Sequence, residues 1–113
     1  MKKETKIYFV IYKITNLKNG MIYIGQHRTT NIDDGYMGSG SVLERIYAEY
    51  RLKGLCIKDY FKRDILFIFD NFNDMNKKEA EIVSKEFIAR PDTYNIYLGG
   101  QGHNTYYGLE IEY

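Results

Sequence analysis

The stretch Val10–Gly25, VIYKITNLKNGMIYIG, decides the fold of this chain. Two short apolar runs, 8–14 and 21–25, flank a polar turn that ends in Asn19-Gly20. Both runs are rich in β-branched and aromatic residues, and an Asn-Gly pair between such runs is the strongest short-range signal for a β-hairpin. We therefore expect a hairpin with Tyr12 on its first strand and Tyr23 on its second.

The strand pattern continues outside this hairpin. The first strand is predicted over Ile7–Thr15, the second over Met21–Gly25 and a third over Tyr60–Phe69. The first two do not alternate cleanly between apolar and polar residues, which favours a sheet covered on both faces. The polar, glycine-dotted segment Gln26–Gly40 predicts a long loop, of the kind that is usually functional or mobile.

Two helices are expected. The first begins at Ser41, where Ser41 and Glu44 form a capping-box pattern, and it ends at Gly54. Its buried stripe is predicted from helical spacing and comprises Val42, Leu43, Ile46, Tyr47 and Tyr50. The second helix follows an N-cap turn at Asn71–Asp74, contains Glu79 to Ile88 and stops before Pro91. A short extended piece, 96–98, and Gly99-Gly100 then close the core.

Length and composition indicate one globular domain. The chain has 113 residues, of which 44% are hydrophobic and 16% aromatic, so a packed core is expected and disorder is not. We expect a single domain over 1–113, with a core at about 7–100 and a tail or linker at 101–113. The single cysteine, Cys56, allows no intramolecular disulfide and favours a reducing, cytoplasmic compartment. No apolar run is long enough to span a bilayer, so no membrane partner is expected.

Positive charge is concentrated at the amino-terminal end, although the net charge is only +1. Residues 1–28 carry six basic side chains and one acidic one, a balance of +5, and the remainder has a balance of −4. A basic hairpin end is a plausible footprint for phosphates. A lysine-rich solvated tail explains Lys2, Lys3 and Lys6 equally well.

Several motifs, taken in order, resemble the GIY-YIG nuclease family. Val10-Ile11-Tyr12 and Tyr23-Ile24-Gly25 are similar to its two signature tripeptides, with Val10 in place of the first glycine. The segments 33–40, 79–83 and 92–95 and the Gly99-Gly100 pair resemble its phage and intron-encoded branch. This resemblance implies an α+β domain, with a small three-stranded antiparallel sheet flanked by helices. It also implies a metal-dependent DNA endonuclease, homing-endonuclease-like and encoded by a phage or mobile element.

The resemblance assigns the metal ligand to the second helix. Glu79, four residues before Val83, is our choice for the ligand of Mg²⁺ or Mn²⁺. Glu81 is a rival, and an alignment on Ser84 would leave the site without a carboxylate. One helical carboxylate suffices, because Mg²⁺ is often held by one or two carboxylates together with phosphate oxygens and waters. Without the resemblance, any of these glutamates reads as a solvated helix residue.

The resemblance also implies roles for Tyr12, Tyr23, Arg45 and Asn95, and the other candidates come from their residue types and positions. Tyr12 and Tyr23 line the active site, where one helps to activate the attacking water; their alternative role is core packing. His27 is a candidate proton acceptor and otherwise a surface residue. Arg45 is the candidate ligand of the scissile phosphate, with Arg28 and Arg63 as rivals, although it could instead pair with Glu49. Asn95 supports the site by hydrogen bonding or is a turn residue. The further candidate DNA contacts are Arg28, Lys13, Lys18 and Arg63.

Two other functions stay open. A binding module of the same fold would hold nucleic acid without cutting it, and a tyrosine-rich protein-interaction domain would not bind it at all. Cys56 and His103 are too isolated to suggest a zinc site and are interpreted as structural. The chain ends about a dozen residues after Gly100, so we expect a minimal nuclease or a fragment. The DNA target, the number of strands cut and the oligomeric state do not follow from the sequence.

Overall fold

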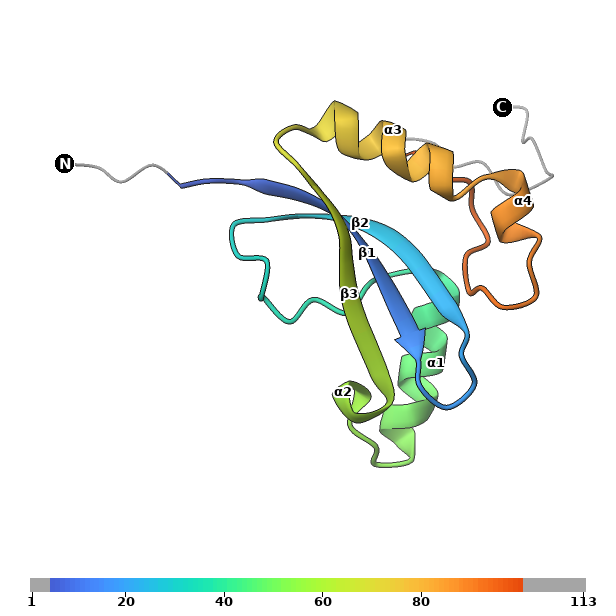
Figure 1. Cartoon of the computed structure of the whole chain (residues 1–113). Helices are drawn as coiled ribbons and strands as arrows, with labels where there is room; N and C mark the ends of the chain where they lie inside the picture. The colour runs from blue at the N-terminus through green and yellow to red at the C-terminus, as the bar shows by residue number, and fades with distance from the viewer. Residues whose placement is uncertain (1–4, 101–113) are drawn as a thin grey trace, which may run out of the picture.

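A three-stranded antiparallel sheet forms the centre of the computed structural model, which describes residues 5–100 (Figure 1). Its strands are β1 (Tyr8–Asn16), β2 (Ile22–Thr29) and β3 (Phe61–Phe69), in the order β2-β1-β3. The predicted sheet with flanking helices is therefore confirmed. The predicted tail 101–113, which includes His103, lies outside the described residues.

The second strand is longer than its sequence suggests. Gln26 to Thr29, predicted as loop, pair with Ile11 to Tyr8 of β1 and continue β2. Polar side chains are tolerated there because β2 is an edge strand. Tertiary pairing with the apolar β1 decides their conformation and overrides their own weak strand preference. The true loop before the first helix spans only residues 30–40.

Helices cover both faces of the sheet, as the strand pattern predicted (Figure 1). On one face lie α1 (Ser41–Leu52) and α2 (Ile57–Tyr60), and on the other α3 (Phe72–Ile82) and α4 (Lys85–Ile88). Each face has its own buried cluster. The α1 side buries Tyr12, Ile14, Leu43, Tyr47, Ile57, Phe61 and Tyr94, and the α3 side buries Ile11, Ile24, Met75, Val83, Phe87 and Ile88.

The ends of α1 follow their local sequence only in part. Gly54 terminates the helix as predicted: its φ is 75°, and the amides of Gly54 and Leu55 donate to the carbonyls of Arg51 and Tyr50. The predicted capping box is wrong. Gly40 occupies the N-cap, no side chain caps the helix, and Ser41 is its first residue.

The single second helix predicted before Pro91 is divided into two. Asn71 is the N-cap of α3, as predicted, and accepts a hydrogen bond from the amide of Asp74. The chain leaves the helix at Val83, and Ser84 begins α4 by accepting a hydrogen bond from the amide of Phe87. The four-residue α2 was not predicted. Among residues 5–100, no helix is long and apolar enough to cross a membrane.

Candidate active site

The hairpin brings Tyr12 and Tyr23 together on the α1 face of the sheet. Tyr12 pairs with Gly25 and Ile14 pairs with Tyr23, so the two phenols are diagonal neighbours with ring centroids 6.2 Å apart. Gly25 is required for this arrangement. A Cβ atom on Gly25 would lie 2.7 Å from Tyr12 Cζ and 3.0 Å from Tyr23 Cε2, so any side chain would collide with the two rings.

A second glycine seats Tyr23 against the start of α1. A Cβ atom on Gly40 would lie 2.8 Å from Tyr23 Cζ and 2.9 Å from its hydroxyl oxygen. This contact explains why a glycine, and not Ser41, occupies the N-cap. Since it does not cap the helix, Ser41 lines a pocket beside Tyr23 instead.

Glu79 approaches the same edge strand from the opposite face. Gln26 Nε2 donates to Glu79 Oε1 at 2.6 Å, and the amide of Gly100 donates to the same oxygen at 2.9 Å. Gly99 packs against the backbone of α3: its Cβ atom would lie 2.8 Å from the carbonyl carbon of Glu79. The Gly99-Gly100 pair therefore holds the Glu79 carboxylate in place, and both of these hydrogen bonds end on Oε1.

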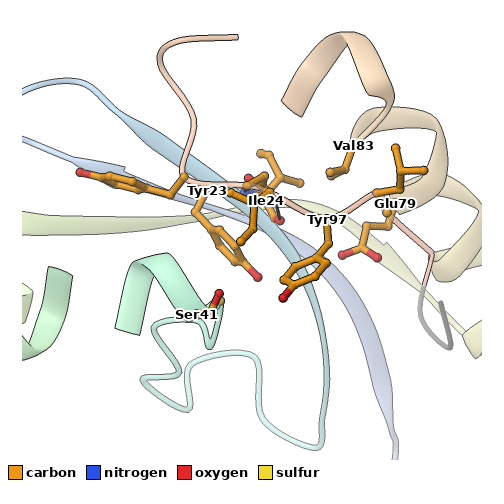
Figure 2. Close-up of a pocket in the computed structure, with 12 residues that line it drawn as sticks. Tyr23, Ile24, Ser41, Glu79, Val83 and Tyr97 are labelled. Carbon is orange, nitrogen blue, oxygen red and sulfur yellow. Dashed lines mark hydrogen bonds between the residues drawn. The ribbon is translucent and has the colours of Figure 1, made fainter. Parts of the chain in front are cut away.

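Tyr23 and Glu79 meet in a pocket of about 120 Å³ at the β2 edge (Figure 2). In Figure 2 the side chains of Tyr23, Tyr97, Ser41 and Glu79 lie around this space. Tyr12 does not line it, because its side chain is only 1% exposed and lies beneath Gly25 and Tyr23. Two of the predicted site residues, Tyr23 and Glu79, thus meet at the surface, and Tyr12 lies behind them.

The phenols hold their protons firmly. Burial, with smaller contributions from the Glu79 carboxylate and Tyr36, raises the pKa of Tyr23 to about 12, and a hydrogen bond with Tyr12 acts in the opposite direction. Burial raises the pKa of Tyr12 far above its usual range, with smaller contributions from Tyr23 and Tyr36. Both side chains are therefore neutral hydrogen-bonding groups near pH 7 in the protein alone.

Asn95 stabilises the edge strand β2 through hydrogen bonds to its backbone. Its buried side chain pairs with the backbone of Ile24 as a neighbouring strand would. Oδ1 accepts from the Ile24 amide at 2.8 Å, and Nδ2 donates to the Ile24 carbonyl at 2.7 Å. The Asn95 amide donates to Thr93 Oγ1, and Thr93 forms a parallel bridge with Ile22. Asn95 and Thr93 thus hold β2 at Ile24 and Ile22, the two residues that flank Tyr23.

His27 lies on the same face, two residues beyond Gly25. Its ring is stacked on Tyr36 with centroids 3.7 Å apart, and Tyr36 in turn meets Tyr12 edge-on at 5.7 Å. His27 Nε2 lies 2.7 Å from Asp34 Oδ2. The aromatic group around Tyr12 is therefore larger than the sequence analysis expected.

Of the arginines proposed as phosphate ligands, Arg45 is exposed near the pocket and Arg63 is held in an ion pair. Arg45 is exposed on α1, four residues and about one helical turn after Ser41, so it lies on the same side of the helix as the pocket. The alternative pairing of Arg45 with Glu49 is not seen among the described residues. Arg63 is largely buried and forms an ion pair with Asp34 at 3.1 Å, so it anchors the 30–40 loop.

The other predicted DNA contacts lie further from the pocket. Arg28 is exposed and lines a second groove with Phe9 and Phe72, and this groove is also lined by Gln26 and His27. Lys13 is half-buried on β1, opposite Ile24, and Lys18 is exposed in the hairpin turn.

The two rivals of Glu79 have other positions. Glu81 is exposed and forms an ion pair with Lys78 at 3.2 Å, away from the pocket lining. Ser84 caps α4. Within the part of the chain that the structure describes, no three His, Cys, Asp or Glu side chains form a group that could hold a metal. An ion at Glu79 would therefore need ligands from substrate or water.

Three residues near the site were missed by the sequence analysis: Gln26, Tyr36 and Tyr97. Gln26 was placed in the predicted loop, and its contact with Glu79 joins residues 53 positions apart. Tyr36 and Tyr97 lie in the segments 33–40 and 96–98, to which the sequence analysis assigned no side-chain role. Neither carries a pattern that separates it from the other tyrosines among the twelve in the chain.

Comparison with known proteins finds a group of proteins from Enterobacteria phage T4. The chain is 46% identical to "Putative endonuclease segB" over 85% of its length and 42% identical to "Putative endonuclease segC" over 93%. It is 37% identical to "Endonuclease segA" over 89%. The chain is similar to phage endonucleases. It covers 41%, 52% and 43% of these three relatives, about half of their length. No family model and no solved structure matches it.

Proposed function

We propose that this chain is a metal-dependent endonuclease domain of the GIY-YIG type. It hydrolyses phosphodiester bonds in DNA, resembles a homing endonuclease and is encoded by a phage or mobile element. The observation that carries the proposal is the pocket in which Tyr23 and Glu79, 56 positions apart in the sequence, meet at the β2 edge. The similarity to phage T4 proteins named as endonucleases supports it independently. So do the tripeptides at 10–12 and 23–25.

The donor set around Glu79 suits Mg²⁺ or Mn²⁺. It consists of oxygen atoms, which hard cations prefer, and both hydrogen bonds to the carboxylate end on Oε1, leaving Oε2 for a ligand. The amide oxygen of Gln26 is buried without a hydrogen-bond partner among the described residues. Glu79 would hold the ion, which when bound supplies positive charge that stabilises the phosphate in the transition state.

Arginine side chains would bind the DNA phosphates. Arg45 is the best placed for the scissile phosphate, because it is exposed on the first helix one turn from Ser41 at the pocket. A guanidinium can donate two parallel hydrogen bonds to a phosphate. Arg28 is exposed beyond the site and would contact the DNA backbone further along, whereas Arg63 holds the loop through Asp34.

The phenols would orient substrate and water, and His27 would accept the proton. A raised pKa keeps the Tyr23 hydroxyl protonated at neutral pH, so it donates a hydrogen bond at the pocket. An imidazole titrates near neutrality and suits proton transfer there. Tyr12 supports Tyr23 from below, and Asn95 keeps the edge strand in register.

Cleavage of a supercoiled plasmid tests this function. The parent protein should nick or linearise the plasmid with Mg²⁺ or Mn²⁺ and stop when EDTA is added. Glu79→Ala should reduce the rate by more than about 10²-fold, because Glu79 is the only glutamate among residues 5–100 that lines the pocket. Glu81→Ala is the matched control: it removes a carboxylate two residues away and should cut like the parent.

Three outcomes would contradict the proposal. A Glu79→Ala variant that cuts as well as the parent would place the metal elsewhere. Binding of the plasmid without cleavage under any metal would favour the binding module of the same fold. A protein that binds no DNA, or binds it without dependence on salt, would favour the protein-interaction domain, because phosphate contacts release counterions and weaken steeply as salt rises.

A further inference from the structure

A single carboxylate organises the loop between β2 and α1. Asp34 Oδ1 accepts from the amide of Tyr36 at 3.0 Å and from Arg63 Nη1 at 3.1 Å. Asp34 Oδ2 lies 2.7 Å from both Thr29 Oγ1 and His27 Nε2. One side chain of the loop thus joins the end of β2 to β3 and contacts the imidazole of the proposed site.

Asp34 is ionised in this network. Burial raises its pKa, but hydrogen bonds from the Tyr36 amide and from His27, Thr29 and Arg63 outweigh burial and hold the pKa well below its usual value. An ionised carboxylate only accepts hydrogen bonds. The nitrogen that faces it, His27 Nε2, must therefore carry the proton.

The imidazole is also held in orientation by its stacking partner. Tyr36 lies parallel to the His27 ring at 3.7 Å and 4°, and its hydroxyl donates to Ser39 Oγ at 2.9 Å. With one nitrogen bound to Asp34 and one face covered, the ring has little freedom to turn over. His27 Nδ1 makes no hydrogen bond to any other residue between 5 and 100 in the structure.

We propose that Asp34 is a positioning residue: it fixes His27 as the Nε2–H tautomer, so that Nδ1 is the nitrogen that accepts the proton of the attacking water. The role of that proton transfer rests on the proposed endonuclease function. A carboxylate behind an imidazole sets the tautomer and stabilises the imidazolium that forms on proton uptake. The proton leaves water for Nδ1, and the Nε2 proton stays on the ring, hydrogen-bonded to ionised Asp34. The ring becomes an imidazolium, and the hydroxide that remains attacks phosphorus.

The decisive variant is Asp34→Asn. Its amide oxygen can replace Oδ1 and keep the hydrogen bonds from Tyr36 and Arg63, which preserves the loop. Its NH₂ group then replaces Oδ2 and donates to Nε2, so the imidazole must carry its proton on Nδ1. Asp33→Asn is the matched control, because it makes the same chemical change one residue earlier at an exposed position.

Nitrogen-15 NMR of the imidazole, recorded at about pH 8.5 where a free imidazole is neutral, reads the tautomer directly. We expect Nε2–H in the parent protein and in Asp33→Asn, and Nδ1–H in Asp34→Asn. A parent ring protonated on Nδ1 would overturn the proposal without any variant. The same tautomer in the parent and in a folded Asp34→Asn would also overturn it.

Kinetics of plasmid cleavage provide the second readout. Asp34→Asn should lower kcat by about 10²-fold or more with KM little changed, because proton transfer is lost while DNA contacts remain. A purely structural role would instead raise KM or lower thermal stability. If the parent cuts no DNA, the proposed function fails, and the NMR result still decides whether Asp34 sets the tautomer.

Discussion

Replacing Gly25 with alanine tests the packing on which the candidate site is built. The new Cβ atom would lie 2.7 Å from Tyr12 Cζ, about 0.8 Å short of an ordinary carbon–carbon contact of about 3.5 Å. Tyr12 is 1% exposed, so its ring cannot swing into solvent. Overpacking of this kind costs about 1–3 kcal/mol. For a domain of this size each kcal/mol lowers Tm by roughly 4–8 °C.

The effect on cleavage should exceed the effect on stability. A displacement of about 1 Å in a catalytic group can cost about 10²-fold in rate, and Tyr23 Cε2 is only 3.0 Å from the same Cβ position. Thermal unfolding by circular dichroism and plasmid cleavage under single-turnover conditions measure the two effects separately. Both assays use the full chain.

Gly20→Ala is the matched control. Its φ of 76° makes alanine unfavourable, but no atom lies within 4 Å of the new Cβ, so it should lose stability and keep activity. The reasoning would be refuted if Gly25→Ala were as stable and as active as the parent, or if Gly20→Ala lost cleavage to the same extent.

Two further predictions concern the edge strand and the phenols. Asn95→Ala leaves the buried amide and carbonyl of Ile24 without partners and should lower the free energy of unfolding by about 2–4 kcal/mol; an unchanged urea midpoint would show that Asn95 does not stabilise β2. Because burial raises the pKa of Tyr23 to about 12, the folded state binds the phenol proton more tightly than the unfolded state does. The stability from this proton is complete below about pH 10 and is lost as pH rises towards 12. In Tyr23→Phe the free energy of unfolding should therefore fall less steeply between pH 10 and 12, by up to about 1 kcal/mol per pH unit. Urea unfolding at several pH values measures this slope. Equal slopes in the variant and the parent would contradict this.

Local patterns in the sequence were sufficient for the strands and helix ends that depend on near neighbours. The Asn19-Gly20 hairpin, the Gly54 terminus and the Asn71 N-cap are each settled within a few residues, and all were predicted correctly. The extension of β2 to Thr29 was not, because it depends on pairing with β1. The capping box at Ser41 failed for a similar reason: Tyr23, from a distant strand, occupies the space at Gly40.

In the candidate site, too, the sequence predicted the individual residues but not the distant partners that hold them. The resemblance to a nuclease family selected Glu79 over Glu81 as the metal ligand, which stays a prediction; the structure shows that Glu79 lines the pocket. No helical pattern distinguishes the two glutamates. The partners that hold the site residues, Gln26 for Glu79 and Asp34 for His27, come from segments that were interpreted only as loop. Such pairings appear only when the strands and the loop are placed in three dimensions.

Binding of Mn²⁺ tests the meeting of Glu79 and Tyr23 most directly. Paramagnetic broadening of NMR signals, recorded on the full chain with a short DNA duplex present, shows which residues surround the ion. We predict that signals of Tyr23, Gln26 and Gly100 broaden first, and that Glu79→Gln abolishes this while Glu81→Gln does not. Broadening centred on another carboxylate, unchanged in Glu79→Gln, would contradict the account.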